Sequence, residues 1–333
     1  MLNIDDELQK KVLRISQEPY VYLDELRVHR LLTENPLEYY RFMRDELANI
    51  AAGRAELELP PKQVFSDPGC SSDFRVMPCI VRRPGSARKT VKLVGTNTLQ
   101  QLVPDQITVG KAFVLHPEEN FVSHVLEACL LSSARTGLCA AIAVDLLSRA
   151  RKKITVIGAG RVGYYAAFYA AQLGGAGEIS IFDNDYARAL QTTALLAQQI
   201  PAVRFSALGE NQASSDADVL VLATTSTEPI CSPHGTNAGL IISLGADTDY
   251  QRELDSTWAK VADIFVDTQD CTRFGDLNSW REAGLIDTAS LVDLFQLLRD
   301  GAPDDSARRR VFVSTGSALF DNLTIGYLLS KIA

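Results

Sequence analysis

Residues 154–185, ITVIGAGRVGYYAAFYAAQLGGAGEISIFDND, constrain the fold more than any other stretch of this 333-residue chain. A short β-branched strand runs into three glycines in GxGxxG spacing: Gly158, Gly160 and Gly163. A helical segment follows, and a second strand then ends at Asp183, 20 residues after Gly163. Strand, glycine turn, helix, strand and terminal acid, in this order, predict a dinucleotide-binding βαβ unit.

The glycines and the acid each have a mechanical role toward a dinucleotide. Gly158 allows the tight turn, Gly160 lets the backbone approach the pyrophosphate, and Gly163 lets helix and strand pack closely. The helix N-terminus offers unpaired N–H groups and a partial positive charge to the phosphates. Asp183 would accept hydrogen bonds from the adenosine ribose, and its charge would repel a 2′-phosphate. We therefore predict NAD as the cofactor, in preference to NADP.

Three further residues complete the predicted cofactor site: Arg161, Val162 and Thr224. Arg161 lies inside the glycine loop and is a cation that could also meet a 2′-phosphate. Thr224 is the penultimate residue of ADVLVLATT, a strand candidate of the same region. The alternative reading is a glycine-rich turn that binds nothing, and the complete βαβ context argues against it.

The region around this unit alternates strands with helical stretches, which predicts a parallel, doubly wound sheet of the Rossmann type. Its strand candidates are ITVIGAG, EISIFDND, VRFSAL, ADVLVLATT, GLIISLGA and ADIFVDT. The tail from Val311, VFVSTGSALFDNLTIGYLLSKIA, is expected to form a strand, a glycine turn and an apolar helix that returns to the N-terminal region.

The first third of the chain has a different pattern of predicted strands and helices. Residues 35–54 have apolar side chains at helical spacing, and Gly53 would end that helix. The runs FRVMPCIV, TVKLVGTN and ITVGKAFVLH are joined by turns, so an antiparallel or mixed sheet is expected. Residues 122–149 read as one long helix. We predict an α/β fold with two domains: residues 131–311 for NAD, and residues 1–130 with 312–333 for substrate and dimerisation.

Composition restricts the class of protein. The net charge of −8, without a basic cluster, argues against nucleic acid as a partner. The N-terminus does not resemble a signal peptide, and apolar runs such as Ala217–Thr224 are too short for a membrane span. Six scattered cysteines, Cys70 among them, fit reduced thiols, and four histidines lack metal-ligand spacing. We expect a cytoplasmic protein without a metal site.

Charged residues in apolar surroundings are the candidates for the substrate half of the site. Lys92 alternates with Val91 and Leu93 in a strand, and Arg135 interrupts a helix of small residues, where a buried guanidinium needs an anion. With Lys62 they could hold a substrate α-carboxylate, which Arg135 would bind bidentately. The alternatives are solvated lysines and a structural ion pair for Arg135.

Asp247 follows an apolar strand directly, where residues line the crevice of a doubly wound sheet. Its carboxylate could be a general base or could bind a substrate ammonium. The alternative is a helix N-cap, a role that suits either Asp247 or Asp249.

These motifs, in this order, resemble the ornithine cyclodeaminase / μ-crystallin family from about Leu59 to the C-terminus. The residues that carry the resemblance are PPK at 60–62, MP at 77–78, KLVGTN at 92–97, SART at 133–136, GAGRVG at 158–163, GAD at 245–247 and STGSALFDN at 314–322.

The resemblance implies a Rossmann domain flanked by a substrate and dimerisation domain, in an NAD-dependent enzyme that forms a homodimer. Lys92 and Arg135 would contact the substrate, and Asp247 would serve acid/base chemistry. Lys62 stands where cyclodeaminases usually have an arginine. Thr315, in the tail motif, joins the predicted substrate-binding residues.

Within the family, LEACLLSSARTG and the DPG before VMP look most similar to the branch that makes 2,3-diaminopropionate. Those enzymes oxidise N-(2-amino-2-carboxyethyl)-L-glutamate with NAD for siderophore or antibiotic assembly. GAD and STGSA look more like ornithine and lysine cyclodeaminases, and the tail has Phe320-Asp321 where the family usually has Glu-Asp. Three alternatives therefore stay open: a cyclodeaminase, a cyclic imino-acid reductase, and a non-catalytic dinucleotide-binding protein like the crystallins.

Overall fold

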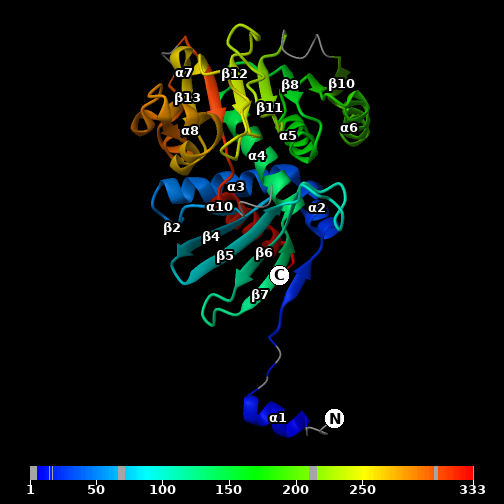
Figure 1. Cartoon of the computed structure of the whole chain (residues 1–333), viewed down its shortest axis with the longest axis vertical. Helices are drawn as coiled ribbons and strands as arrows, with labels where there is room; N and C mark the ends of the chain where they lie inside the picture. The colour runs from blue at the N-terminus through cyan, green and yellow to red at the C-terminus, as the bar shows by residue number, and fades with distance from the viewer. Residues whose placement is uncertain are drawn as a thin grey trace.

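The computed structural model describes residues 6–14, 16, 18–66, 72–209, 216–303 and 307–332; Cys70 therefore lies outside the described residues. Figure 1 shows two parts, one built on a parallel sheet and the other on a mixed sheet. Helix α4 (Cys129–Leu147) lies where the two parts meet and contacts elements of both.

The parallel sheet confirms the predicted Rossmann-type fold. Within the described residues it has eight strands in the order β10-β9-β8-β11-β12-β15-β13-β14, all paired in parallel. The strands are β8 (Lys153–Ile157), β9 (Glu178–Phe182), β10 (Arg204–Leu208), β11 (Val219–Leu222), β12 (Leu240–Ser243), β13 (Ala262–Val266), β14 (Val292–Asp293) and β15 (Arg309–Val313). The strand order reverses between β8 and β11, where ligands bind in doubly wound sheets.

Helices connect these strands. They are α5 (Arg161–Gln172), α6 (Tyr186–Gln199), α7 (Trp258–Val261), α8 (Gly275–Glu282) and α9 (Leu294–Asp300), with short 3-10 turns η1 (Gln269–Arg273) and η2 (Thr288–Ser290). Helix α5 starts directly after the glycine turn, so its N-terminus points to the carboxyl end of β8.

The second sheet is mixed, as expected from its turn-linked strands. Its order is β1-β7-β6-β5-β4-β2, with β3 also paired to β4; β1 runs parallel to β7 and the other pairs are antiparallel. The strands are β1 (Val21–Leu23), β2 (Glu56–Glu58), β3 (Gln63–Ser66), β4 (Asp73–Arg83), β5 (Ser86–Thr96), β6 (Thr108–Leu115) and β7 (Val122–Glu127). The accompanying helices are α1 (Asp6–Leu13), α2 (Glu25–Glu34), α3 (Pro36–Ala51) and α10 (Ala318–Ser330).

The prediction of one long helix over residues 122–149 is wrong at its start. Residues 122–127 form β7, which pairs with β6 on one side and with β1 on the other. The helix begins at Cys129, where the Glu127 carboxylate accepts hydrogen bonds from the backbone N–H groups of Cys129 (2.5 Å) and Leu130 (2.9 Å). The apolar pattern of these residues fits either a helix or a short strand. Pairing with β1 and β6 in the sheet decides for the strand.

Helix α4 is apolar on every side because both parts of the molecule pack around it. By length and composition it is the one described helix that could cross a membrane, yet 78% of that window is buried inside the protein. Gly137 allows the close packing of α4 on α5, since a Cβ there would lie 2.5 Å from the backbone of Tyr165. These features are those of a core helix.

The C-terminal tail links the two sheets. Strand β15 lies between β12 and β13 in the parallel sheet, and α10 then contacts β4, β5 and α3. The expected return of the tail to the N-terminal part is therefore seen in α10. Because β15 extends to Val313, the division proposed at residue 311 falls inside a strand, and the domain boundaries stay a prediction.

Candidate active site

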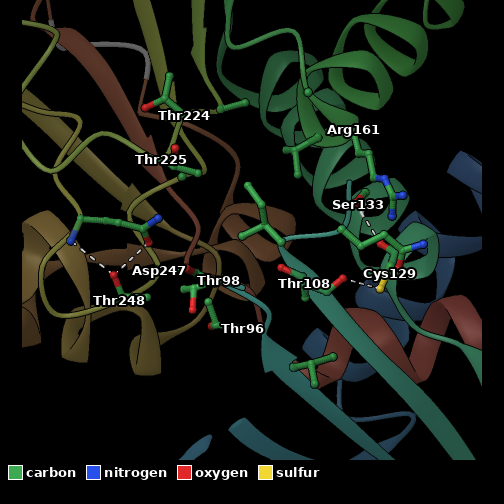
Figure 2. Close-up of a pocket in the computed structure, with 18 of the residues that line it drawn as sticks. Thr96, Thr98, Thr108, Cys129, Ser133, Arg161, Thr224, Thr225, Asp247 and Thr248 are labelled. Carbon is green, nitrogen blue, oxygen red and sulfur yellow. Dashed lines mark hydrogen bonds between the residues drawn. The ribbon is translucent and has the colours of Figure 1, made fainter. Parts of the chain in front are cut away.

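A cleft of about 840 Å³ lies at the carboxyl ends of β8, β11 and β12. Figure 2 shows Thr224, Thr225 and Asp247 on one side, and Arg161, Ser133 and Cys129 on the other. Of the predicted cofactor residues, Gly160, Arg161, Val162 and Thr224 line this cleft.

The glycine turn has the geometry that its sequence predicts. Gly158 adopts a φ of +104°, which side-chain-bearing residues rarely adopt, and a Cβ on Gly163 would lie 1.8 Å from the Gly158 carbonyl oxygen. A Cβ on Gly160 would meet nothing within 4 Å, and Gly160 makes no side-chain cap for α5. The first turn of α5 thus has no side-chain cap and open space beside Gly160, as an anion site at a helix N-terminus requires.

Asp183 supports the glycine turn from the next strand. Its carboxylate accepts hydrogen bonds from the backbone N–H groups of Ala159 (2.8 Å) and Asp185 (2.9 Å). Arg188 lies 3.4 Å from it and lines the cleft, whereas Gly158, Gly163 and Asp183 are not among the lining residues. The predicted contact of Asp183 with a ribose stays a prediction.

Arg161 joins the glycine loop to the mixed-sheet part of the molecule. Its guanidinium lies 3.4 Å from the carboxylate of Glu25, in the first turn of α2, and both side chains are more than one-third exposed. A phosphate in the cleft would therefore compete with an exposed carboxylate for this cation.

An inner pocket of about 140 Å³ adjoins the cleft and brings together all five predicted substrate and catalytic residues: Lys62, Lys92, Arg135, Asp247 and Thr315. Val162, Leu244 and Asp247 line both cavities, so these residues mark the junction between them. Four residues that line the inner pocket are cationic, namely Lys62, Arg75, Lys92 and Arg135, and Asp247 is the anionic one.

Lys92 is buried on the inward face of β5, with 2% exposure, while its neighbour Leu93 is 40% exposed. The predicted alternation is thus confirmed, and the reading of Lys92 as a solvated lysine is wrong. Its Nζ lies 2.7 Å from Asp321 Oδ2 and donates to Ser132 Oγ at 2.9 Å. Burial lowers the pKa of Lys92 to about 8, and the charge of Asp321 limits that fall.

Arg135 is also held by Asp321, so the alternative of an ion pair is present. Its Nε donates to Asp321 Oδ1 at 2.9 Å. Among the described residues, its two terminal nitrogens have no hydrogen-bond partner, and they lie where a Cβ on Gly316 would come within 2.9 Å. The ion pair therefore orients Arg135 and leaves the outer edge of its guanidinium available to an anion.

Lys62 is 6% exposed, so the reading of a solvated lysine is wrong here as well. Its Nζ reaches the carbonyl oxygens of Thr315 (3.3 Å) and Asp247 (3.5 Å) and lies 3.7 Å from the centre of the Phe274 ring. Burial lowers the pKa of Lys62, and the charge of Asp247 offsets only part of this effect.

Asp247 lies at the junction and pairs with Arg75, whose Nη1 is 2.8 Å from Asp247 Oδ2. Burial opposes the ionisation of Asp247, but Arg75 and Lys62 outweigh it and lower its pKa. The residues after Asp247 and Asp249 form no helix, and α7 begins only at Trp258, so the N-cap alternative is wrong for both.

No group of three or more metal-ligating side chains occurs within the part of the chain that the structure describes. The profile of the ornithine cyclodeaminase/mu-crystallin family matches residues 26–330. The chain belongs to the ornithine cyclodeaminase/mu-crystallin family.

Among curated relatives of this family member, an alanine dehydrogenase of Archaeoglobus fulgidus is 27% identical over 228 residues, which cover 64% of this chain and 68% of the relative. A Δ1-pyrroline-2-carboxylate reductase of Thermococcus litoralis, solved with NADH and L-proline, has a TM-score of 0.82 at 18% identity, covering 93% of this chain and 97% of its own. An archaeal alanine dehydrogenase dimer with bound NAD has a TM-score of 0.80 at 23% identity, with coverages of 94% and 97%. The family and these relatives identify the chain as an enzyme.

Four buried or half-buried carboxylates in this chain were not predicted as site residues. Asp321 holds Lys92 and Arg135, and Asp73 pairs with Arg75 at 3.1 Å. Asp267 accepts from Ser314 Oγ (2.6 Å), and Glu253 accepts from residues at the ends of β11 and β12. The sequence did hold a signal for Asp321, which is a lone acid in the apolar tail helix. It also held one for Arg75, which is two residues before Met77 in a strand and therefore lies on the same face as this buried residue.

Proposed function

We propose that this protein is an NAD-dependent oxidoreductase that acts on the amine-bearing carbon of an amino acid. Within that class, we propose oxidation of N-(2-amino-2-carboxyethyl)-L-glutamate to 2,3-diaminopropionate and 2-oxoglutarate. One observation carries the proposal: a small pocket with four cationic side chains opens directly into the cleft of a dinucleotide-binding turn.

NAD is the cofactor of this proposal. The open space at Gly160 and the uncapped start of α5 fit a pyrophosphate, and Asp183 supports the turn through the N–H of Ala159. The relatives solved with NADH or NAD support the same choice. When bound, the nicotinamide ring supplies a two-electron acceptor, and the chain supplies binding, orientation and charge.

Lys92 and Arg135 bind the carboxylate next to the reacting carbon. Asp321 holds both cations in place, at 2.7 Å and 2.9 Å, while the terminal nitrogens of Arg135 stay available for a bidentate contact. A carboxylate in this pocket loses its water shell, and two buried cations replace it. The adjoining carbon is then fixed at the junction with the cleft.

Asp247 takes the proton from the substrate amine. Its lowered pKa keeps it ionised at neutral pH, and its position at the junction is shared by both cavities. Removal of the proton leaves a lone pair on the nitrogen, which assists the loss of two electrons from the neighbouring carbon. Arg75 orients the carboxylate through its second oxygen.

A larger substrate fits because the inner pocket also adjoins an outer cavity of about 550 Å³. Lys62, Arg75 and Asp247 line both, and the outer one is also lined by Arg273, Asp73 and Asp249. The inner pocket alone holds little more than a small amino acid. A substrate with additional carboxylates can extend past Arg75 toward Arg273, which supports an N-substituted glutamate over alanine.

The overall reaction balances as substrate plus NAD plus water giving 2,3-diaminopropionate, 2-oxoglutarate, NADH and a proton. Such a product would supply siderophore or antibiotic assembly in the cytoplasm. A homodimer is part of the proposal, supported by exposed apolar side chains on the mixed sheet, where the rings of Phe65 and Phe74 stack at 4.9 Å and Leu93 is 40% exposed.

The experiment is an incubation of the purified protein with NAD and each candidate substrate, with NADH, ammonia and 2-oxoglutarate measured together. With N-(2-amino-2-carboxyethyl)-L-glutamate, we expect NADH and 2-oxoglutarate in equal amounts and no ammonia. Ammonia with proline from ornithine, without net NADH, would instead identify a cyclodeaminase. Oxidation of proline or reduction of its imine would identify an imino-acid reductase, and dinucleotide binding without any turnover a crystallin-like protein.

A further inference from the structure

Glu253 is a fully buried carboxylate directly behind the wall of the cofactor cleft. Its Oε1 accepts hydrogen bonds from the backbone N–H (2.8 Å) and the hydroxyl (2.9 Å) of Thr224, at the end of β11. Its Oε2 accepts from Ser243 Oγ (2.7 Å) and from the N–H groups of Leu244 (3.1 Å) and Gly245 (2.9 Å), at the end of β12. One carboxylate thus joins the ends of two neighbouring strands.

The segment that carries Glu253 is itself fixed. Its backbone N–H donates to the carboxylate of Asp276, at 3.1 Å to Oδ2, and its carbonyl oxygen accepts from the N–H groups of Ile230 and Cys231, both at 3.0 Å. Gly245 must be glycine here, because a Cβ would lie 2.5 Å from Glu253 Oε1. The position of the negative charge relative to the cleft wall is therefore well defined.

All the hydrogen bonds to this carboxylate come from neutral groups. Among the described residues, no lysine, arginine or histidine forms an ion pair with Glu253. Five donors favour the anion, but burial raises the pKa of Glu253, and hydrogen bonds alone leave its charge uncompensated in a low-dielectric region. Three other buried carboxylates near the site differ. Asp321 has two cations, and Asp267 lies behind β13 and β15, away from the cleft. Asp276 is 1% exposed, accepts from the backbone N–H groups of Glu253 and Leu254, and does not line the cleft.

Three residues that bind Glu253, namely Thr224, Leu244 and Gly245, line the cleft. Leu244 also lines the inner pocket, so Glu253 stands behind the end of the cleft that adjoins this pocket. The oxidised nicotinamide ring carries a positive charge and the reduced ring carries none. A nicotinamide ring bound at this end of the cleft would be separated from Glu253 by the wall that Thr224, Leu244 and Gly245 form.

Resting on the proposed function, we propose that Glu253 is the counter-charge of the oxidised nicotinamide. It lowers the dissociation constant of NAD⁺ relative to that of NADH, in addition to holding the two strand ends together. Glu253 is thus a positioning residue with an electrostatic effect on the cofactor equilibrium, and it touches neither substrate nor cofactor.

The test is the ratio Kd(NADH)/Kd(NAD⁺), measured by titration calorimetry without substrate on the full chain. In Glu253→Gln we expect this ratio to fall about 10-fold, as the loss of a charge at moderate distance and intermediate dielectric predicts. Loss of hydrogen bonds at the cleft wall weakens both forms alike and leaves the ratio unchanged. The ratio therefore separates the charge of Glu253 from its structural role.

Two matched controls remove one feature each. Ser243→Ala deletes one hydrogen bond to Glu253 and keeps the charge, so both dissociation constants should rise together. Asp267→Asn removes a different buried carboxylate, which lies at the same edge of the sheet but not behind the cleft. The ratio Kd(NADH)/Kd(NAD⁺) should then stay within about twofold of wild type. If Glu253→Gln does not fold, Glu253→Ala with and without added formate replaces it. Formate must then restore binding of NAD⁺ more than binding of NADH.

The outcomes distinguish the two proposals. If the wild-type protein binds neither NAD⁺ nor NADH, the proposed function itself fails. If it binds both and the ratio is the same in Glu253→Gln, in which the charge is gone, Glu253 is only a structural latch and the present inference is overturned.

Discussion

The glycine turn and the inner pocket are built in opposite ways. The turn is made by consecutive residues, 158–163, and its conformation depends on the absence of side chains at its three glycines. The inner pocket is assembled from residues spread between Lys62 and Gly316, and its geometry depends on ion pairs such as those of Lys92 and Arg135 with Asp321. The proposed cofactor site is therefore a local property of this chain, whereas the proposed substrate site is a property of the whole fold.

The largest effect that would separate the two regions is expected for Arg135→Ala. Loss of the guanidinium removes the proposed bidentate contact to the substrate and leaves Asp321 with Lys92 as its single cation. We expect kcat/KM to fall about 1000-fold, the range for breaking a buried charged contact. The dissociation constant of NAD should change less than threefold by calorimetry. A comparable loss of NAD binding would mean that Arg135 is structural, and Arg135→Lys tests whether charge alone suffices.

Gly163→Ala is the converse test, because it perturbs the turn and spares the pocket. A Cβ would lie 1.8 Å from the Gly158 carbonyl oxygen, so helix α5 must shift away from β8. We expect NAD binding to weaken about 100-fold and the free energy of unfolding to fall by about 2 kcal/mol. Gly239→Ala, whose Cβ meets its first neighbour only at 3.9 Å, is the matched control and should leave both quantities near wild type.

The pH dependence of substrate binding sharpens the role of Lys92. Its pKa of about 8 means that the ammonium is present below pH 8 and is lost above it. KM should therefore rise about 10-fold as the pH increases from 7 to 9, because the substrate carboxylate loses a charged partner. In Lys92→Arg the cation persists at all these values, so this rise should disappear from the KM profile. A rise that survives in Lys92→Arg would assign the titration to another group.

The smallest effect is expected at Arg161. Its ion pair with Glu25 is exposed, and such pairs contribute at most about 1 kcal/mol. Arg161→Ala should weaken NAD binding less than fivefold, whereas Glu25→Ala should leave it unchanged or slightly tighter, since it frees the cation for phosphate. A loss of 100-fold or more in Arg161→Ala would instead place this arginine at the centre of cofactor recognition.

The same contrast explains what could be predicted from the sequence. The Rossmann sheet and its glycine turn follow from local patterns, and Lys92 and Arg135 were recognisable because each charge interrupts an apolar stretch. The strand β7 could not be separated from the following helix, since its pairing with β1 and β6 comes from distant segments.

The supporting carboxylates needed the fold. Glu253 looks like an ordinary surface acid in the sequence, and its five donors come from the ends of two other elements. Asp321 is different, because an acid inside the apolar helix α10 could have been matched with the buried Arg135. Asp247 was predicted at the right end of its strand, but its pairing with Arg75 depends on the contact between the two sheets.

The central claim is that Lys92 and Arg135 form a carboxylate site beside the cofactor. The most direct test is calorimetric titration of 2-oxoglutarate into the NADH-loaded protein, for wild type and Arg135→Ala. We predict one bound 2-oxoglutarate per wild-type chain and a loss of at least 100-fold in affinity in the variant, with NADH still bound. Equal affinities in the two proteins would contradict the account.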